Sequence, residues 1–270
     1  MNRPAIRELH TMAEFESVCL LFARIWGTEP DTAPVSAEIM RALSHAGNYI
    51  AGAHEDGHLV GASVGFFGEP TGITLHSHIT GTAMGRGIGL ALKLHQRQWA
   101  LDRGLKRITW TYDPLIRRNA HFNLTKLGAR PEEYLPSFYG AMDDAINGGD
   151  ESDRVLTAWD LTTPLDTHAR DSAAATLPAG AVQGIRNRDG RPELGTLDEE
   201  FILIDLPDDI EALRRTDPAA ARSWRLAVRH VLGDLLAEGA RVTGFHDRRR
   251  YVVHRTPAGG LPPLSTRSHQ

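Results

Sequence analysis

A glycine-rich stretch between an expected strand and an expected helix is the part of the sequence best suited to chemistry. Gly81, Gly85, Gly87 and Gly89 fall within residues 76–94. Glycine lets the backbone approach a ligand closely, and the first N–H groups of a helix are unpaired at the positive end of its dipole. The stretch therefore predicts an anion site suited to a pyrophosphate. A turn that merely reverses the chain is the alternative interpretation.

Two common phosphate-binding patterns do not fit this stretch. A nucleotide P-loop needs Gly-Lys-Ser/Thr at the helix start, whereas residues 87–89 are Gly-Ile-Gly. A dinucleotide fingerprint needs a third glycine, and that position holds Leu90 or Leu92, depending on which glycine begins the count. Both nucleotide patterns are therefore excluded.

The stretch resembles the signature of the GNAT superfamily of acyl-CoA N-acyltransferases, Arg/Gln-x-x-Gly-x-Gly/Ala. In residues 84–89, MGRGIG, the required glycines are Gly87 and Gly89, and a methionine takes the usual Arg/Gln position. Residues 119–128, NAHFNLTKLG, resemble a second family motif, N-A-x-x-x-Tyr-x-Lys-Leu-Gly-Phe. The resemblance covers about residues 4–161.

The resemblance implies an α/β fold with a mixed, mostly antiparallel sheet flanked by helices and splayed between its fourth and fifth strands. Acetyl-CoA or another acyl-CoA would lie in the splay as co-substrate, with its pantetheine along residues 79–81; no metal is expected. The residues expected to hold it are Ile79, Thr80, Gly81, Gly85, Arg86, Gly87, Ile88, Gly89, Leu90 and Asn119.

Two histidines, His76 and His78, lie on the strand that leads into the glycine-rich stretch. Strand alternation predicts that both face one side and that Ser77 and Ile79 face the other. Histidine titrates near neutrality, and family members often carry a base on this strand, so both are candidate catalytic bases for an attacking amine. A role as hydrogen-bonded sheet residues is an equal alternative. A metal site is less favoured because no Cys, Asp or Glu accompanies them at ligand spacing.

The tyrosine that protonates the leaving coenzyme A thiolate in many family members is replaced here by Leu124. Asn123 is adjacent, but one residue along a helix turns a side chain by about 100°, which predicts a poor substitute. Tyr139 could reach the same space as a catalytic residue, with packing as the alternative. Because a thiol has a pKa near about 8.5, the thiolate can also leave unaided.

Polar residues after the expected strand at 107–112 complete the candidate site. Asp113 is expected to orient the amine as a catalytic residue. Arg117 and Tyr112 are expected to bind the substrate, the arginine through a bidentate contact with a carboxylate. As alternatives, Arg117 and Arg118 bind the adenosine phosphates or are solvated.

Helices and strands alternate around these residues, which predicts an α/β class. Helices are expected at 12–26, 36–45, 87–103, 119–127 and 217–238, and strands at 49–54, 58–67, 74–80, 107–112, 155–161, 201–206, 241–245 and 251–254. Residues 162–196 are rich in Ala, Pro, Gly, Asp and Arg, which predicts a linker or an irregular wrap. We therefore expect an acyl-CoA-binding domain at 1–161 and a small α+β unit at 197–270.

The composition, with 41% hydrophobic and 24% charged residues in 270, is that of a folded globular protein. No apolar run suits a membrane span or a signal peptide, and the single Cys19 agrees with a reducing cytoplasm. A net charge of −4 weighs against nucleic-acid binding. We therefore expect a cytoplasmic protein that binds neither membranes nor nucleic acid.

Together these observations predict an enzyme, an N-acyltransferase. It would move an acetyl or larger group, such as succinyl, from acyl-CoA to a primary amine of a small molecule by direct attack. The alternative is a catalytically silent acyl-CoA-binding module whose C-terminal unit dimerises or binds a partner. The missing tyrosine favours this alternative and the two histidines oppose it; a homodimer is compatible with both.

Overall fold

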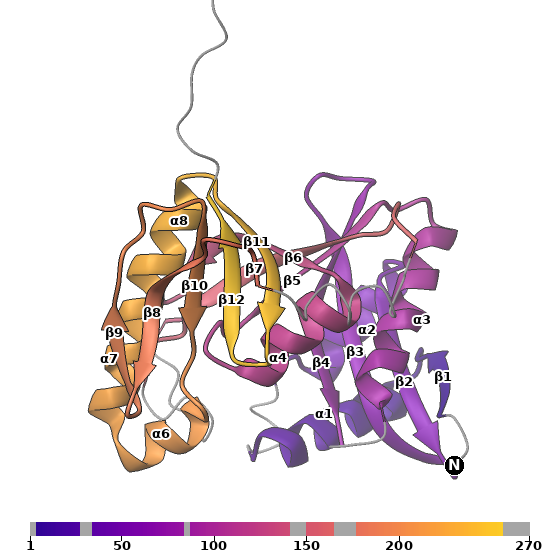
Figure 1. Cartoon of the computed structure of the whole chain (residues 1–270). Helices are drawn as coiled ribbons and strands as arrows, with labels where there is room; N and C mark the ends of the chain where they lie inside the picture. Colours follow the sequence, from indigo (N-terminus) through magenta and orange to yellow (C-terminus); the bar gives the residue numbers. More distant parts are fainter. Residues whose placement is uncertain (1–3, 28–33, 84–86, 141–149, 165–176, 256–270) are drawn as a thin grey trace, which may run out of the picture.

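The computed structural model describes residues 4–27, 34–83, 87–140, 150–164 and 177–255, which form two sheets (Figure 1). The first has seven strands in the order β1-β2-β3-β4-β5-β7-β6, and the second has five in the order β11-β12-β10-β8-β9. Among the strand pairs of the described residues, only β4–β5 and β8–β10 are parallel. The predicted α/β fold with a mostly antiparallel sheet flanked by helices is confirmed. None of the described helices is long and apolar enough to cross a membrane.

The first sheet and its helices follow the predicted order closely. The strands are β1 (Ala5–Glu8), β2 (Tyr49–Glu55), β3 (His58–Gly68), β4 (Thr74–Thr82), β5 (Arg107–Tyr112), β6 (Arg130–Leu135) and β7 (Arg154–Asp160). The helices are α1 (Met12–Trp26), α2 (Ala37–His45), α3 (Ile88–Asp102), α4 (Arg117–His121) and the π-helix η2 (Phe122–Leu127). The edge strands β1 and β6 were not predicted, because their short sequences AIRE and RPEEYL carry charges in place of an apolar alternation.

Local signals explain why α1 begins and ends where it does. Thr11 accepts a hydrogen bond from the backbone N–H of Glu14, whose carboxylate accepts one from the Thr11 N–H, so the capping box is complete. Gly27 ends the helix in the left-handed conformation, with φ of 67°. The buried face, which includes Phe15 and Phe22, packs onto β3 and β4. This packing places α1 beside the strand that leads into the glycine-rich stretch.

The second sheet follows β7 in the chain. Its strands are β8 (Val182–Arg188), β9 (Arg191–Leu194), β10 (Phe201–Asp205), β11 (Arg241–His246) and β12 (Arg250–His254). Its helices are α6 (Ile210–Thr216), α7 (Pro218–Val228), the π-helix η3 (Arg229–Gly233) and α8 (Asp234–Ala237). The strands β8 and β9 correct the expectation of a linker or irregular wrap at 162–196. Their sequences VQGIRNR and RPEL have little apolar periodicity, and pairing with β10 makes β8 a strand.

The two sheets share one core. Figure 1 shows the second sheet and its helices, coloured orange to yellow, beside β5, β6 and β7. The largest buried apolar cluster joins Tyr112 and Leu124 of the first part to Ile204, Trp224 and Tyr251 of the second. The hydroxyl groups of Tyr112 and Tyr251 lie 3.2 Å apart. The C-terminal elements therefore bury the side chains at the end of β5 and in η2.

Candidate functional site

The strands β4 and β5 pair at their beginnings and then separate. Their parallel pairing covers only Thr74–His76 of β4 and Arg107–Thr109 of β5, although β4 continues to Thr82 and β5 to Tyr112. A cleft of about 300 Å³ lies between the separated parts. The cleft is lined by Ser77, His78 and Thr80 of β4, by Gly89 and Lys93 of α3, and by Trp110 of β5.

The N-terminus of α3 opens onto this cleft. Gly87 precedes the helix with φ of 70°, a conformation that favours glycine. At Gly89 an added Cβ would meet nothing within 4 Å, and φ is ordinary, so neither packing nor backbone strain explains a glycine there. Glycine inside a helix is unfavourable by up to about 1 kcal/mol relative to alanine. The open space at Gly89, beside unpaired helix N–H groups, fits the predicted pyrophosphate.

The other residues expected to hold the cofactor lie around this point. Thr80 and Asn119 line the cleft. Ile88 is fully buried, so it can offer only its backbone, and the half-buried Leu90 packs against the core. Gly85 and Arg86 lie outside the described residues. At Gly81 a Cβ would come within 2.9 Å of the Phe22 and Trp26 rings of α1, so that glycine permits close packing of α1.

A β-bulge in β4 changes which side chains share a face. The β3–β4 register shifts between Val64 and Gly65, so His78 is the additional residue. His76 and His78 lie on one side as predicted, with rings 5.2 Å and 5.8 Å from the Phe66 ring. The expectation that Ile79 faces the opposite side is wrong, since Ile79 packs on the cluster under α1. The bulge breaks the two-residue alternation on which that expectation rested.

The two histidines differ in access. His76 places Nδ1 3.1 Å from the Thr109 hydroxyl, and burial, followed by the charges of His78 and Lys93, lowers its pKa to about 4. His78 lines the cleft, and burial lowers its pKa, an effect partly offset by a backbone hydrogen bond at Pro34. Both imidazoles are therefore neutral at pH 7. His78 is the one placed to accept a proton from a group in the cleft.

Lys93 was missed by the sequence analysis, although it lies on the cleft wall. Its side chain is buried, and Nζ donates to Ser77 Oγ at 2.8 Å and to Gln96 Oε1 at 3.4 Å. The same nitrogen lies 4.0 Å from the centre of the Trp110 ring. Burial lowers the pKa of Lys93 to about 7. Lysine is almost never fully buried, so a lysine in a sequence is expected at the surface. Nothing near Lys93 in the sequence indicated otherwise.

The structure places Asp113 outside the cleft and corrects its expected role. Its carboxylate is buried, with both oxygens bonded to Arg225 of α7 at 2.9 Å and 3.0 Å, and Arg214 of α6 lies 2.6 Å away. Although burial raises the pKa of Asp113, these two guanidinium groups hold it well below its usual range. Both oxygens are thus engaged between the two sheets, and Asp113 does not orient an amine in the cleft.

Arg117 and Tyr112 also point to the C-terminal part. Arg117 donates to the Leu206 carbonyl and lies 2.8 Å from Asp208, and the Tyr112 hydroxyl meets that of Tyr251. Of these two residues, only Tyr112 is also among those that line the cleft. The expected contact of Arg117 with a substrate carboxylate is therefore corrected, because the second sheet occupies its guanidinium. Arg118 likewise pairs with Glu211.

Tyr139 lies at the rim of the cleft. Its hydroxyl is 3.4 Å from the hydroxyl of Thr111, which lines the cleft, and the side chain is 44% exposed. Thr111 and Thr109 alternate with Trp110 along β5, so they share the side on which His76 lies. Tyr139 is therefore placed beside the histidine side of the cleft.

The π-helix η2 brings Asn123 into the cleft and turns Leu124 away. Leu124 is buried in the core shared with the second sheet. Asn123 lines the cleft and accepts a hydrogen bond from Trp110 Nε1 at 3.3 Å. The α-helical turn of about 100° on which the expectation for Asn123 rested does not apply, because the segment winds as a π-helix. Asn123 still makes a poor substitute for the tyrosine as an acid, since an amide does not release a proton at neutral pH.

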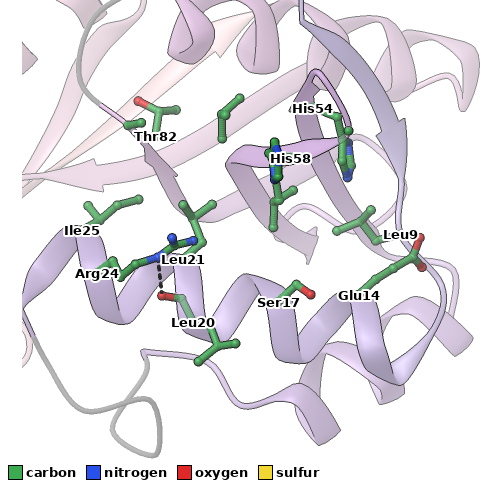
Figure 2. Close-up of a pocket in the computed structure, with 14 residues that line it drawn as sticks. Leu9, Glu14, Ser17, Leu20, Leu21, Arg24, Ile25, His54, His58 and Thr82 are labelled. Carbon is green, nitrogen blue, oxygen red and sulfur yellow. Dashed lines mark hydrogen bonds between the residues drawn. The ribbon is translucent and has the colours of Figure 1, made fainter.

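A larger hollow of about 800 Å³ lies between α1 and the ends of β2, β3 and β4. Figure 2 shows His54 and His58 across this hollow from α1. It contains none of the predicted site residues; Glu14 is committed to the capping box, and Arg24 donates to the Leu20 carbonyl. The smaller cleft between β4 and β5 therefore remains the better candidate, since it combines an open helix N-terminus with buried titratable groups.

No protein-family model and no curated protein match the sequence, but solved structures match the fold. An N-acetyltransferase from Staphylococcus aureus Mu50 superposes with a TM-score of 0.50 and 16% identity, covering 59% of this chain and 99% of its own. The first sheet and its helices therefore have a GNAT-like fold. The resemblance seen in the two sequence motifs is thereby confirmed at the level of the fold.

Two further solved structures are similar. An acetyltransferase of the GNAT family from Streptococcus pneumoniae has a TM-score of 0.46 and 17% identity, covering 57% of this chain and 98% of its own. The other is a Salmonella typhimurium protein assigned as an acetyltransferase and solved with its cofactor acetyl-CoA. It has a TM-score of 0.49 and 14% identity, and the match covers 61% of this chain and 98% of its own.

Proposed function

We propose that the chain is an acyl-CoA-dependent N-acyltransferase that acts on a primary amine of a small molecule. The parting of β4 and β5 beside the N-terminus of α3 carries this proposal. After His76, no strand among the described residues pairs with the edge of β4 that faces β5. Such an edge offers N–H and C=O groups to a ligand. The amides of a pantetheine can use these groups while its pyrophosphate lies near Gly89.

Acyl-CoA would supply an activated acyl group as a thioester, and the chain's own residues would manage protons around it. His78, neutral at pH 7 and on the cleft wall, takes the proton that an attacking ammonium must lose. The amine attacks directly, because Cys19 is unsuited to carry the acyl group. Its thiol lies in the core under α1, and burial raises its pKa.

A catalytically silent acyl-CoA-binding module is the second candidate. It is favoured by the burial of Leu124 in the shared core and by Tyr112, whose hydroxyl is bonded to Tyr251. Neither residue gives the cleft a free tyrosine hydroxyl. The position of His78 on the cleft wall favours the enzyme.

The test combines calorimetric binding of coenzyme A with thiol-release assays. Acetyl-CoA and succinyl-CoA are each offered with pools of amino acids, amino sugars and polyamines. We expect binding at sub-millimolar concentration and amine-dependent release of thiol, with both lost in Gly89→Trp. Binding without release from any pool would support the silent module. No binding of any acyl-CoA would overturn both candidates.

A further inference from the structure

Aminolysis of a thioester needs a proton at the leaving sulphur. The amine nitrogen forms a bond to the acyl carbon, the C–S bond breaks, and the sulphur leaves with its electron pair. The amine gives up a proton, and the thiolate takes one to become a thiol. A group positioned to supply that second proton accelerates such steps by about 10²–10⁴-fold.

Lys93 lies at the deep end of the cleft. The last β4–β5 pair joins His76 to Thr109, and the next residue on each strand, Ser77 and Trp110, contacts the Lys93 ammonium group. The lysine nitrogen therefore lies just where the two strands begin to part.

The lysine and the histidines approach the cleft from opposite faces of the sheet. Leu75 packs in the cluster with Trp99 and Ala100 of α3, and Ser77 bonds Lys93 of the same helix. His76 lies between these two residues in the strand and therefore faces away from α3. His78 faces the same way, because both histidine rings contact the Phe66 ring. An amine that gives its proton to His78 would attack from one face, and the sulphur would depart toward the other.

Lys93 has neutral partners only. The oxygens within its reach belong to Ser77 and Gln96, and no described carboxylate forms an ion pair with it. Burial without a counter-ion makes the ammonium form costly and brings the lysine pKa to about 7, below the value of about 8.5 typical of a thiol. His76 and His78 are the charged or titratable groups on the adjoining strand, and both are neutral at pH 7.

We propose that Lys93 is the catalytic acid that protonates the departing coenzyme A sulphur. The assignment rests on the proposed function. Of the described residues that line the cleft, His78, Lys93 and Tyr112 can titrate, and Tyr112 is bonded to Tyr251. The amide of Asn123 cannot release a proton at neutral pH. After transfer, neutral Lys93 recovers a proton from water, and the amine's proton leaves through His78, so the cycle balances.

The test uses the full chain and the variants Lys93→Met and Lys93→Gln, with exposed Lys106→Met as the matched control. Lys93→Gln keeps a donor for Ser77 but cannot exchange a proton, so it covers the case in which the methionine variant misfolds. With acetyl-CoA and an accepted amine, we expect turnover to fall about 100-fold or more in both Lys93 variants. The control should remain within about twofold of the wild type.

A second readout requires no turnover. Bound coenzyme A is titrated by the ultraviolet absorbance of its thiolate, with desulfo-coenzyme A as the binding control. In the wild type a protonated Lys93 should lower the thiol pKa by about one unit or more, and in both variants that shift should vanish while desulfo-coenzyme A still binds. Unchanged turnover together with an unchanged thiol pKa would overturn the assignment of Lys93. Failure of the wild type to bind coenzyme A would instead overturn the proposed function.

Discussion

Asp113 at the end of β5 is held by both terminal nitrogens of Arg225 on α7, with Nη1–Oδ1 at 2.9 Å and Nη2–Oδ2 at 3.0 Å. Arg214 and Asp150 complete the group: Asp150 lies 3.2 Å from Arg214 and 3.0 Å from Arg225. Two buried carboxylates thus face two buried guanidinium groups of opposite charge. Because buried charges are tolerated only when paired, this cluster joins the helices of the second sheet to the first.

Asp113→Asn should therefore lower the free energy of unfolding by about 3–5 kcal/mol, since it leaves the arginines with one buried carboxylate in place of two. Urea unfolding measures this loss. Asp208→Asn is the matched control, because Asp208 pairs with Arg117 but is 87% exposed and should cost less than about 1 kcal/mol. Equal costs for the two variants would contradict the structural role. At a temperature where Asp113→Asn stays folded, its turnover should be near that of the wild type.

The shared core also predicts that the first 164 residues do not fold alone. Removing 165–270 would expose Tyr112 and Leu124 to water and leave Asp113 without its arginines. We expect such a fragment to bind a hydrophobic dye and to lose a cooperative unfolding transition. A fragment that unfolds cooperatively and binds coenzyme A would instead establish the N-terminal part as an independent domain.

Local signals explain how much of the fold and the site could be predicted. The bounds of α1 follow from the Thr11 capping box and Gly27, and the glycines before α3 indicate the open helix N-terminus. These signals act within a few residues, so the sequence displays them directly. The cleft itself was expected only from the family resemblance, which implied a splay between these strands, and His78 was expected as a candidate base on the strand that leads into it.

The remaining features depend on partners that are distant in the chain. Asp113 meets arginines more than 100 residues away, and β8 is a strand because β10 pairs with it. Lys93 is buried because Ser77 and Trp110 close over it. The inward turn of Asn123 comes from π-type winding that residue spacing does not show. A single sequence carries no local signal for such contacts.

Gly89→Leu should separate ligand binding from stability. An added side chain at Gly89 meets no atom within 4 Å, so we expect the unfolding free energy to change by no more than about 1 kcal/mol. Coenzyme A affinity should fall about tenfold or more, because the side chain would fill the space beside the helix N–H groups. Gly87→Leu is the contrasting variant, since its φ of 70° makes any side chain strained. Calorimetry and urea unfolding measure both effects, and undiminished affinity in Gly89→Leu would rule out a ligand at this point.

Protonation of His78 should cause the loss of activity on the acidic side, or acidic limb, of the pH–rate profile. Burial lowers its pKa below the ordinary 6.5, so the base is lost only as the pH falls through that lowered value. His78→Ala should reduce turnover about 100-fold or more and remove this limb. His76→Ala should reduce turnover less, because His76 does not line the cleft, and exposed His58→Ala should have no effect. A limb that moves with the pKa of the acceptor amine would show that the amine, not His78, titrates.

Lys93 should make stability rise with pH, as a paired carboxylate does, but in the neutral to alkaline range rather than the acidic range. Burial lowers its pKa from 10.5 to about 7, so between these values the unfolded chain binds a proton that the folded chain does not. Stability from this group therefore rises with pH, and the cost of burying the charged form is largest at pH 7 and below.

Lys93→Met removes that cost. The variant should gain stability relative to the wild type at pH 7, and the gain should shrink by at most about 1.4 kcal/mol for each pH unit above 7. Urea unfolding at pH 7, 8 and 9 measures the difference, with Lys106→Met as the control. A difference that stays constant with pH would show that Lys93 keeps an ordinary pKa and cannot exchange protons at neutrality.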